Sequence, residues 1–376
     1  MTRKIPMLDL KSQYAFIEKE VLDAIQAVIK SSAFIQGKEV GCFEMELASK
    51  LEVAHCISCG NGTDALQLSL MALELQAGDE IIVPAFTYIA PVEAVALLNL
   101  KPVLIDVDAC TFNISPDQIE RSISPKTKAI IVVHLYGQCA AMEKILALAK
   151  KYKLYVIEDN AQSILSEYIY SKGISVKAGC IGDIGTTSFF PSKNLGTYGD
   201  GGALMTNNAN LAKTIKTLAN HGQEEKYIHS KIGINSRLDT LQAAILNIKL
   251  KYLNDYTQRR QEAAAIYDRE LSRLTNLLLP FRTSYSTHVF HQYTIRVKDR
   301  YKLKAFLSNK GIDSMIYYPI PVHLQPAYSY LGYVRGDFPI AELLSEEVLS
   351  LPMHSELKED DVMYICESIK EFYNYG

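Results

Sequence analysis

The stretch AHCISCGNGTDALQLSLMALEL, residues 54–75, holds a strand, a glycine-rich turn and a helix in immediate succession. AHCISCG is strand-like, and NGTDALQLSLMALEL has the helical spacing of apolar residues with Asn61 or Thr63 as the cap at its start. A strand that passes through a turn directly into a helix is a unit of an α/β sheet. This stretch therefore predicts the fold class, and the flanking sequence repeats the unit.

Further strand-like and helix-like segments alternate from about Leu47 to Asn208. The strands are EIIVPAFTY (80–88), KPVLIDVD (101–108), KAIIVVHLYG (128–137) and KLYVIEDN (153–160). The helices between them are PVEAVALLN (91–99), SPDQIERSI (115–123) and CAAMEKILALAKKY (139–152). This rhythm predicts a mostly parallel sheet with helices on both faces.

The pattern changes after Asn235. Residues 237–271 form one long helical pattern, which we expect to bridge a large domain and a smaller one. The smaller domain contains a strand-like segment (288–297), a helix-like segment (300–311), a Pro-rich loop (317–328) and a final helix (358–373). We predict a large domain at 1–245, with the N-terminal segment included, and a small α+β domain at 246–376.

Composition indicates an ordinary soluble globular protein of 376 residues, 48% hydrophobic and 22% charged, with a formal net charge of −3. No long basic run or apolar span points to a nucleic acid or membrane partner, and the N-terminus lacks the apolar core of a signal peptide. Seven scattered cysteines fit reduced thiols and a cytoplasmic location. The Cys56/Cys59 pair has no second ligand pair, so we predict no metal site.

Gly60, Gly62 and Ala65 match the dinucleotide-binding pattern G-x-G-x-x-A, so an NAD-dependent oxidoreductase is a remote alternative. That fingerprint needs an acid at the end of the next strand, and the strand here ends in PAFTY. The turn still predicts a phosphate site, because a helix N-terminus presents free N–H groups. Gly62 and Thr63 would supply them.

Lys193 lies in SFFPSKNLGTYGDGGALMTNN (188–208), where its neighbours are aromatic residues and glycines. Such surroundings desolvate an amine, lower its pKa and make it a nucleophile. The alternative is a loop lysine whose stem packs while its head stays in water.

Three other side chains belong at the same edge of the predicted sheet, because open α/β sheets bind ligands at the carboxyl ends of their strands. They are Tyr88, Asp159 and Ser188. Alone, Asp159 could cap a helix and Tyr88 could be a core residue. Together with Lys193 and the phosphate turn, they describe a site for pyridoxal 5'-phosphate (PLP), which needs an amine, a carboxylate, a flat face and phosphate donors.

Seven strings occur in the order NGTDAL, PAFTYIAPVEAV, EDNAQS, TSFFPSKNLGTYGDGGA, HGQ, NSRLDTLQAAIL and YPIPVHLQPAY. In these strings, and over nearly its whole length, the chain resembles the sugar aminotransferases of the DegT/DnrJ/EryC1/StrS family. The resemblance implies the fold of the fold-type-I PLP-dependent transferases. That fold has a large domain with a seven-stranded, mostly parallel mixed sheet between helices, and a smaller α+β C-terminal domain.

The resemblance also implies a role for each matched residue. Lys193 matches the Schiff-base lysine, Asp159 the partner of the pyridine nitrogen, Gln162 the partner of the ring hydroxyl and Tyr88 the stacking residue. Gly62, Thr63 and Ser188 match the phosphate ligands, and Asn235 matches an asparagine that reaches the phosphate from the neighbouring subunit. The chain is therefore expected to form a homodimer with shared active sites.

For the substrate, the resemblance implies a nucleotide-linked keto-sugar with L-glutamate as amino donor. The chain is most similar to enzymes that make UDP-2-acetamido-3-amino-2,3-dideoxy-glucuronate from the 3-keto sugar for surface polysaccharides. A dTDP- or UDP-linked 3- or 4-keto-6-deoxy sugar stays open, because Tyr317 stands where those enzymes tend to have histidine. A PLP-dependent dehydratase, with histidine in place of Lys193, and a non-enzymatic regulator are the competing functions.

Three residues are expected on the substrate side of the site. Arg237 would reach the partner's site and bind a carboxylate of glutamate or of a uronic acid. Tyr318 and His323, in the Pro-rich loop, would close over the sugar. The alternatives are an ion pair between Arg237 and Asp239, and a purely structural His323.

Overall fold

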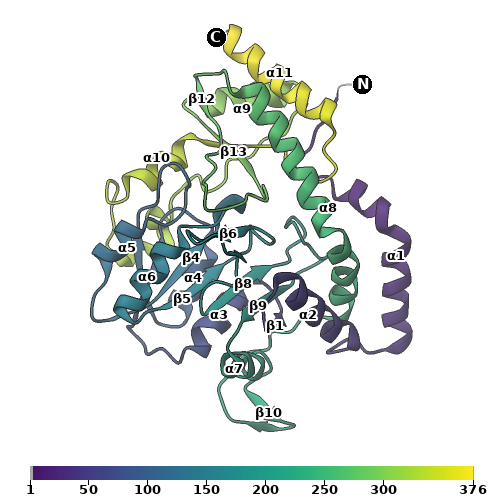
Figure 1. Ribbon diagram of the computed structural model, residues 1–376, viewed down its shortest axis with the longest axis vertical. Helices are drawn as coiled ribbons and strands as arrows, with labels where there is room; N and C mark the ends of the chain where they lie inside the picture. The colour runs from purple at the N-terminus through teal and green to yellow at the C-terminus, as the bar shows by residue number, and fades with distance from the viewer. Residues whose placement is uncertain (1–2, 376) are drawn as a thin grey trace.

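The computed structural model describes residues 3–375, and a large β-sheet lies at its centre (Figure 1). Within the described residues its seven strands follow the order β1-β9-β8-β5-β4-β2-β3. Their bounds are β1 (His55–Cys59), β2 (Glu80–Pro84), β3 (Lys101–Ile105), β4 (Thr127–Val133), β5 (Tyr155–Asp159), β8 (Ile184–Ser188) and β9 (Gly202–Thr206). β9 runs antiparallel to both neighbours, and the other strands run parallel to one another. The predicted mostly parallel α/β sheet is therefore confirmed.

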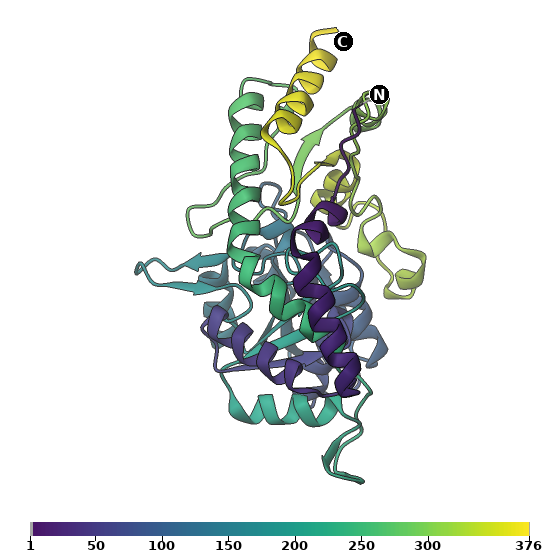
Figure 2. The same cartoon turned by 90° about the vertical axis from the view of Figure 1, so that its right-hand side faces the viewer.

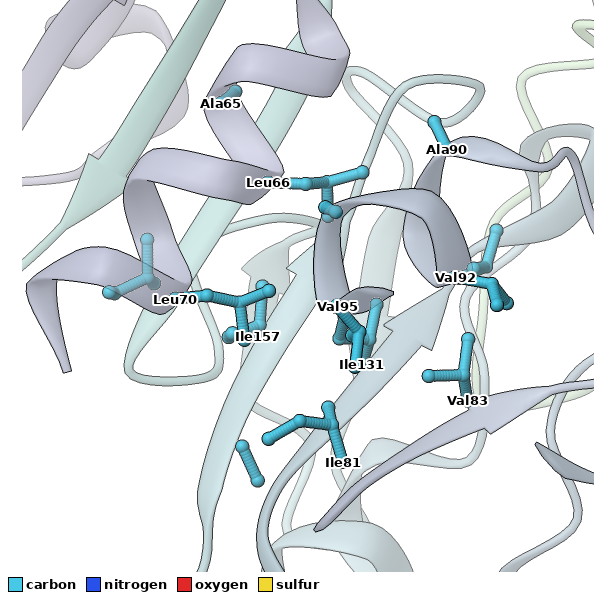
Figure 3. Close-up of a cluster of buried hydrophobic side chains, with 14 of the residues drawn as sticks. Ala65, Leu66, Leu70, Ile81, Val83, Ala90, Val92, Val95, Ile131 and Ile157 are labelled. Carbon is cyan, nitrogen blue, oxygen red and sulfur yellow. The ribbon is translucent and has the colours of Figure 1, made fainter. Parts of the chain in front are cut away.

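Helices cover both faces of this sheet, because consecutive residues of each buried strand point to opposite sides. On β4, Ile131 packs in one hydrophobic cluster and Ile130 in another. One face carries α3 (Gly62–Ala72), α4 (Ala90–Leu97) and α7 (Ala209–Ala219), and the other carries α2 (Lys38–Leu51), α5 (Pro116–Ser122) and α6 (Met142–Tyr152). Figure 3 shows the first face, with Leu66, Leu70 and Val95 of the helices over Ile81, Ile131 and Ile157 of the strands.

The long helix predicted at 237–271 is α8 (Thr240–Leu271). Its first half packs against α1 (Leu10–Ser31) and α2, and its second half against α11 (Glu359–Tyr375). Figure 2 shows α8 running from the sheet to the C-terminal part of the chain. The helix therefore forms the bridge that the sequence predicts.

The C-terminal part has its own small antiparallel sheet, β12-β13-β14. Its elements are β12 (Leu277–Leu278), β13 (Tyr293–Val297), α9 (Arg300–Asn309), β14 (Val348–Leu351) and α11. Its core contains Tyr267, Tyr293 and Ile365, and Ile5 from the start of the chain joins it.

The segment between α9 and β14 returns to the large sheet. It contains η2 (Val322–Leu324), η3 (Pro326–Leu331) and α10 (Pro339–Glu347). Val322 and Leu344 pack in the same cluster as α3 and α4, and Val322 N donates to Ala85 O at 3.0 Å. The hydrophobic clusters thus cross position 245 in both directions, and the division into 1–245 and 246–376 stays a prediction.

Short elements complete the described chain. They are η1 (Leu135–Gly137), the hairpin β6 (Glu167–Ile169)–β7 (Ser175–Lys177) and the hairpin β10 (Gln223–Glu225)–β11 (Ile228–His229). Figure 1 shows β10 at the end of the molecule opposite α11. Among residues 3–375, no helix is both long and apolar enough to cross a membrane.

Candidate active site

A cavity of about 480 Å³ lies where the strands of the large sheet end. Eight of the predicted site residues line it: Gly62, Thr63, Tyr88, Asp159, Gln162, Ser188, Lys193 and Tyr318. They come from segments that follow β1, β2, β5 and β8 and from the Pro-rich loop. The fold therefore brings together the groups that the sequence predicts at one edge of the sheet.

The first turn of α3 forms one wall of this cavity. Asn61 is its N-cap, and its side chain accepts a hydrogen bond from Asp64 N at 2.8 Å. A Cβ on Gly62 would lie 2.7 Å from the Cβ of Ser188, so the close approach of α3 to β8 requires glycine. The first N–H groups of a helix have no intrahelical acceptor, so this wall is suited to an anion.

Asp159, the last residue of β5, is 7% exposed. One of its carboxylate oxygens accepts a hydrogen bond from Ala161 N at 3.0 Å. Burial raises the pKa of this carboxyl, and the hydrogen bond from Ala161 and the positive charge of Lys193 oppose the shift. Its backbone is also fixed, because His134 N donates to Asp159 O at 3.1 Å.

The preceding residue, Glu158, supports the same strand end from the opposite face of the sheet. Its carboxylate accepts hydrogen bonds from three backbone N–H groups, those of Gly179, Ile181 and Gly182. It also lies 2.7 Å from Nε2 of His134, whose Nδ1 accepts from Ala140 N. Nε2 of His134 is therefore the protonated nitrogen, and it donates to Glu158.

Lys193 lies in the loop between β8 and β9, where Lys193 N donates to Phe190 O at 2.8 Å. Burial lowers the pKa of its amine to about 8, against the opposing effect of the Asp159 carboxylate. The amine is therefore partly neutral near pH 8, as a nucleophile must be.

Aromatic residues contribute to the cavity wall: Tyr88, Phe190, Tyr317 and Tyr318 line it, and Tyr136 packs behind Tyr318. The ring of Tyr318 stacks on that of Tyr136, with centroids 6.2 Å apart and planes 7° apart. Gln162 joins the two residues: its Oε1 accepts from Tyr136 N at 2.7 Å, and its Nε2 donates to Tyr318 Oη at 2.8 Å. Both tyrosines have left-handed backbones, with φ of 59° and 61°. Such strain is typical of residues held by a functional site. The ring of Tyr88 is 59% exposed.

The residues of the cavity wall that the sequence analysis did not single out include His291 and Gln292, and Tyr317, which bears on the choice of sugar, also lines the wall. Nδ1 of His291 lies 3.2 Å from Oδ1 of Asn194, the residue after Lys193. Burial and the charges of Lys193 and Arg260 lower the pKa of His291 well below its usual value, so the ring is neutral. The sequence feature that could have indicated these residues is the polar pair His291-Gln292 inside the apolar segment 288–297.

Three predicted residues lie outside the cavity. Asn235 is exposed, and Arg237 lines a separate cavity of about 420 Å³ beside α2 and α7. The Arg237 guanidinium donates to Asn220 Oδ1 at 3.4 Å, and its buried Nε has no partner among residues 3–375. The alternative of an ion pair between Arg237 and Asp239 or another acid is not favoured, because the contact that its guanidinium makes within residues 3–375 is with the Asn220 amide.

His323 lies outside the cavity in this chain. Its side chain is enclosed, with Nε2 3.0 Å from Oε1 of Glu342 and its ring packed edge-on against Phe338. This enclosure favours the structural alternative for His323, and its contact with the sugar stays a prediction. The enclosure arises because η2 turns His323 toward α10 while Tyr318 faces the cavity.

Residues 15–370 match the model of the DegT/DnrJ/EryC1/StrS aminotransferase family. A pleiotropic regulatory protein of Geobacillus stearothermophilus is 46% identical over 99% of both chains. A UDP-2-acetamido-2-deoxy-3-oxo-D-glucuronate aminotransferase of Pseudomonas aeruginosa is 44% identical over 97% of this chain and 99% of the relative. A dTDP-3-amino-3,6-dideoxy-alpha-D-galactopyranose transaminase of Aneurinibacillus thermoaerophilus is 44% identical over 98% and 99%.

Solved structures agree with these relatives. A DegT DnrJ EryC1 StrS aminotransferase from Brucella abortus superposes with a TM-score of 0.93 at 40% identity, covering 98% of this chain and 99% of its own. The ntda protein of Bacillus subtilis, solved with bound cofactor PMP, has a TM-score of 0.86 at 31% identity, covering 99% and 85%. PMP is the aminated form of PLP.

A chain with this fold and these matches is an enzyme of known class: a PLP-dependent aminotransferase that acts on sugars. The NAD-dependent alternative is wrong, and the glycine turn before α3 belongs to the PLP fold. More narrowly, the chain belongs to the DegT/DnrJ/EryC1/StrS aminotransferase family.

Proposed function

We propose that this enzyme moves an amino group from L-glutamate to the 3-keto group of UDP-2-acetamido-2-deoxy-3-oxo-glucuronate, for surface polysaccharide synthesis. The observation that carries the catalytic part is a single cavity that holds a desolvated amine, Lys193, and a desolvated carboxylate, Asp159. The sugar is proposed from the 44% identity to the Pseudomonas aeruginosa relative.

The residues of the cavity fit PLP. The N-terminus of α3 offers N–H groups, and Gly62 leaves room beside Ser188 that a Cβ would fill. Thr87 Oγ1 is buried and has no partner in the described chain, so a ligand donor or acceptor could pair with it. The exposed ring of Tyr88 is available to cover a flat ligand.

When bound, PLP supplies the electron sink that lets an amino group move between carbon atoms. Lys193 would hold the cofactor covalently and carry the proton between cofactor and substrate carbon. Asp159 would keep the pyridine nitrogen protonated, which suits a carboxylate fixed by Ala161. Gln162 has a second amide hydrogen, beyond the one it gives Tyr318, for the ring hydroxyl.

We also propose that the enzyme is a homodimer with shared sites. Asn235 and Arg237 are outside their own chain's cavity, and the unpaired Nε of Arg237 is a donor available to a ligand carboxylate. Large apolar side chains are exposed on α1, the following turn and α2: Phe16, Leu22, Ile29, Phe34, Ile35 and Met45. Apolar side chains gathered in this way are typical of a protein interface. Sedimentation equilibrium measures the predicted dimer mass.

The sugar is tested with a panel of UDP- and dTDP-linked keto-sugars, each assayed with L-glutamate. Turnover of the UDP-linked uronate above all others supports the proposal. Preference for a 3- or 4-keto-6-deoxy sugar, as expected from the 44% identity to the dTDP-sugar transaminase and from Tyr317, overturns the uronate and leaves the aminotransferase intact.

Arg237→Met makes the panel sharper. If Arg237 binds a uronate carboxylate, the variant loses turnover of the uronate and keeps the glutamate half-reaction. If it binds glutamate instead, the half-reaction fails whichever sugar is offered.

A further inference from the structure

Two buried cations lie on α8, and the proposed chemistry uses neither of them. Lys249 is 1% exposed and Arg260 is 4% exposed. They are eleven residues apart, which is about three turns of an α-helix, so both side chains leave α8 on nearly the same side. That side faces the sheet and the active-site loops.

Neither cation is paired with a carboxylate in the described part of the chain; both donate to backbone carbonyls. Lys249 Nζ donates to Gly196 O at 2.7 Å and lies 5.0 Å from the centre of the Tyr198 ring. Arg260 Nη1 donates to Phe290 O at 3.1 Å, His291 O at 3.4 Å and Met353 O at 2.9 Å. Burial lowers the pKa of Lys249 to about 8 and that of Arg260 to about 10.

A buried cation without a counter-ion is unfavourable for folding, so stability alone does not account for two of them. The carbonyls that they bind give the explanation. Gly196 closes the tight turn that carries Lys193, where a Cβ at position 196 would lie 2.5 Å from Pro191 O. Phe290 has a left-handed backbone, with φ of 47°, and precedes His291 in the cavity wall.

The two anchored loops also meet each other, because His291 Nδ1 lies 3.2 Å from Asn194 Oδ1. Asn194 is adjacent to Lys193, and its amide nitrogen donates to Val289 O at 3.3 Å. A displacement of either loop would therefore move the amine of Lys193 relative to His291. α8 holds both loops from behind.

We propose that Lys249 and Arg260 are positioning residues for the transamination: Lys249 fixes the loop of Lys193, and Arg260 fixes the His291 segment. This inference rests on the proposed role of Lys193. Neither cation touches the cavity, so each acts through the carbonyls that it binds.

The test compares Lys249→Met with Lys251→Met. Methionine keeps the length and removes the donor, and Lys251 is an exposed neighbour on α8 that bonds Glu20. Amide hydrogen exchange of the PLP-loaded and cofactor-free proteins is followed in peptides covering 189–199, together with the single-turnover half-reaction with L-glutamate.

Lys249→Met should increase exchange in 189–199 and slow the half-reaction roughly tenfold, with little change in apparent glutamate affinity and no loss of denaturant resistance. Exchange and rate equal to those of Lys251→Met would overturn the proposal. Arg260→Lys, which cannot span three carbonyls, should raise exchange in 288–297 in the same way. Unchanged exchange there would overturn the second half.

Failure of the proposed function would look different. If Lys193 does not hold the cofactor, borohydride reduction labels another lysine, whereas the exchange result for 189–199 is unaffected.

Discussion

Two cavities of this chain, the one that Lys193 lines and the one that Arg237 lines, differ in how complete they are. The larger, at the strand ends, receives its amine, carboxylate, aromatic rings and helix N-terminus from one chain. The smaller holds Arg237, whose Nη1 donates to Asn220 Oδ1 and whose buried Nε has no hydrogen-bond partner within residues 3–375. Under the proposed homodimer, the difference is a division of roles: the groups for the cofactor come from one chain, and Arg237 of a second copy would select the substrate.

The segment that carries Arg237 supports this division, because it is rigidly attached to the back of the cofactor cavity. Ser236 Oγ accepts from Gly60 N at 2.9 Å and donates to Asp64 at 2.6 Å. Asn235 and Arg237, on either side of Ser236, are thereby fixed relative to the first turn of α3 while lying outside its own cavity.

The largest effect is expected from Lys193→Ala. It should abolish turnover and leave the fold intact, because Lys193 is the lysine of the strand-end cavity. Borohydride reduction of the wild type followed by peptide mapping should place the pyridoxyl group on this residue. A label on Lys11 or Lys38 would contradict the assignment.

Asp159→Asn should still bind PLP, because the α3 wall is unchanged, and should slow the half-reaction by on the order of 100-fold. The rate falls because asparagine is neutral and removes the fixed negative charge beside the pyridine nitrogen. Stopped-flow absorbance with L-glutamate measures the rate. Near-normal turnover would mean that another group stabilises that charge.

Covalent capture of PLP by the cofactor-free protein should depend on pH. The neutral amine attacks, and burial sets the pKa of Lys193 to about 8. Below pH 8 the capture rate should fall by about tenfold per pH unit, and above pH 8 it should level off. A rate still rising steeply up to pH 10 would indicate a solvent-exposed amine.

Mixing inactive Lys193→Ala subunits with inactive Arg237→Ala subunits tests the division itself. If sites are shared, a mixed dimer regains one intact site, and equal mixing restores about a quarter of wild-type activity. If activity does not return after mass spectrometry has verified subunit exchange, Lys193 and Arg237 act in one site from the same chain.

The smallest effect on catalysis is expected from His323→Ala. It removes one hydrogen-bond partner of Glu342, whose carboxylate still accepts from Gly336 N, so the free energy of unfolding should fall by about 1 kcal/mol. Turnover per folded molecule should stay within about twofold, because His323 is remote from the cavity. A selective rise in KM for the sugar would show that His323 contacts the substrate.

Much of the fold could be predicted from the sequence, because β2, β4 and β5 are apolar segments rich in β-branched residues and α8 is an unbroken helical pattern. Lys193 and Asp159 were also predictable, since Asp159 ends β5 and Lys193 lies in the loop after β8. The local sequence is sufficient for both residues, because a polar residue at or shortly after the end of a strand lies at the edge of the sheet.

His291 and Gln292 were missed because the polar pair that they form inside an apolar segment does not show which surface it reaches. They reach the cavity only when the small domain packs on the large one, and the spacing of residues within either segment does not encode that packing. The position of His323 was hard to predict for a related reason. A Pro-rich string predicts a rigid loop, but the direction in which each side chain leaves it depends on turns such as η2.

The single reversed strand, β9, has a consequence for how the enzyme assembles. A parallel neighbour needs a long crossover, whereas an antiparallel one can pair after a short return. The lysine loop is such a return, closed by the pairing of Ser188 with Gly202. Contacts between residues so near in sequence form early and at low entropic cost. The backbone pairing that closes the lysine loop can thus form during synthesis, before α8 and the segment of His291 are made; the contacts of Lys249 and His291 with this loop form later.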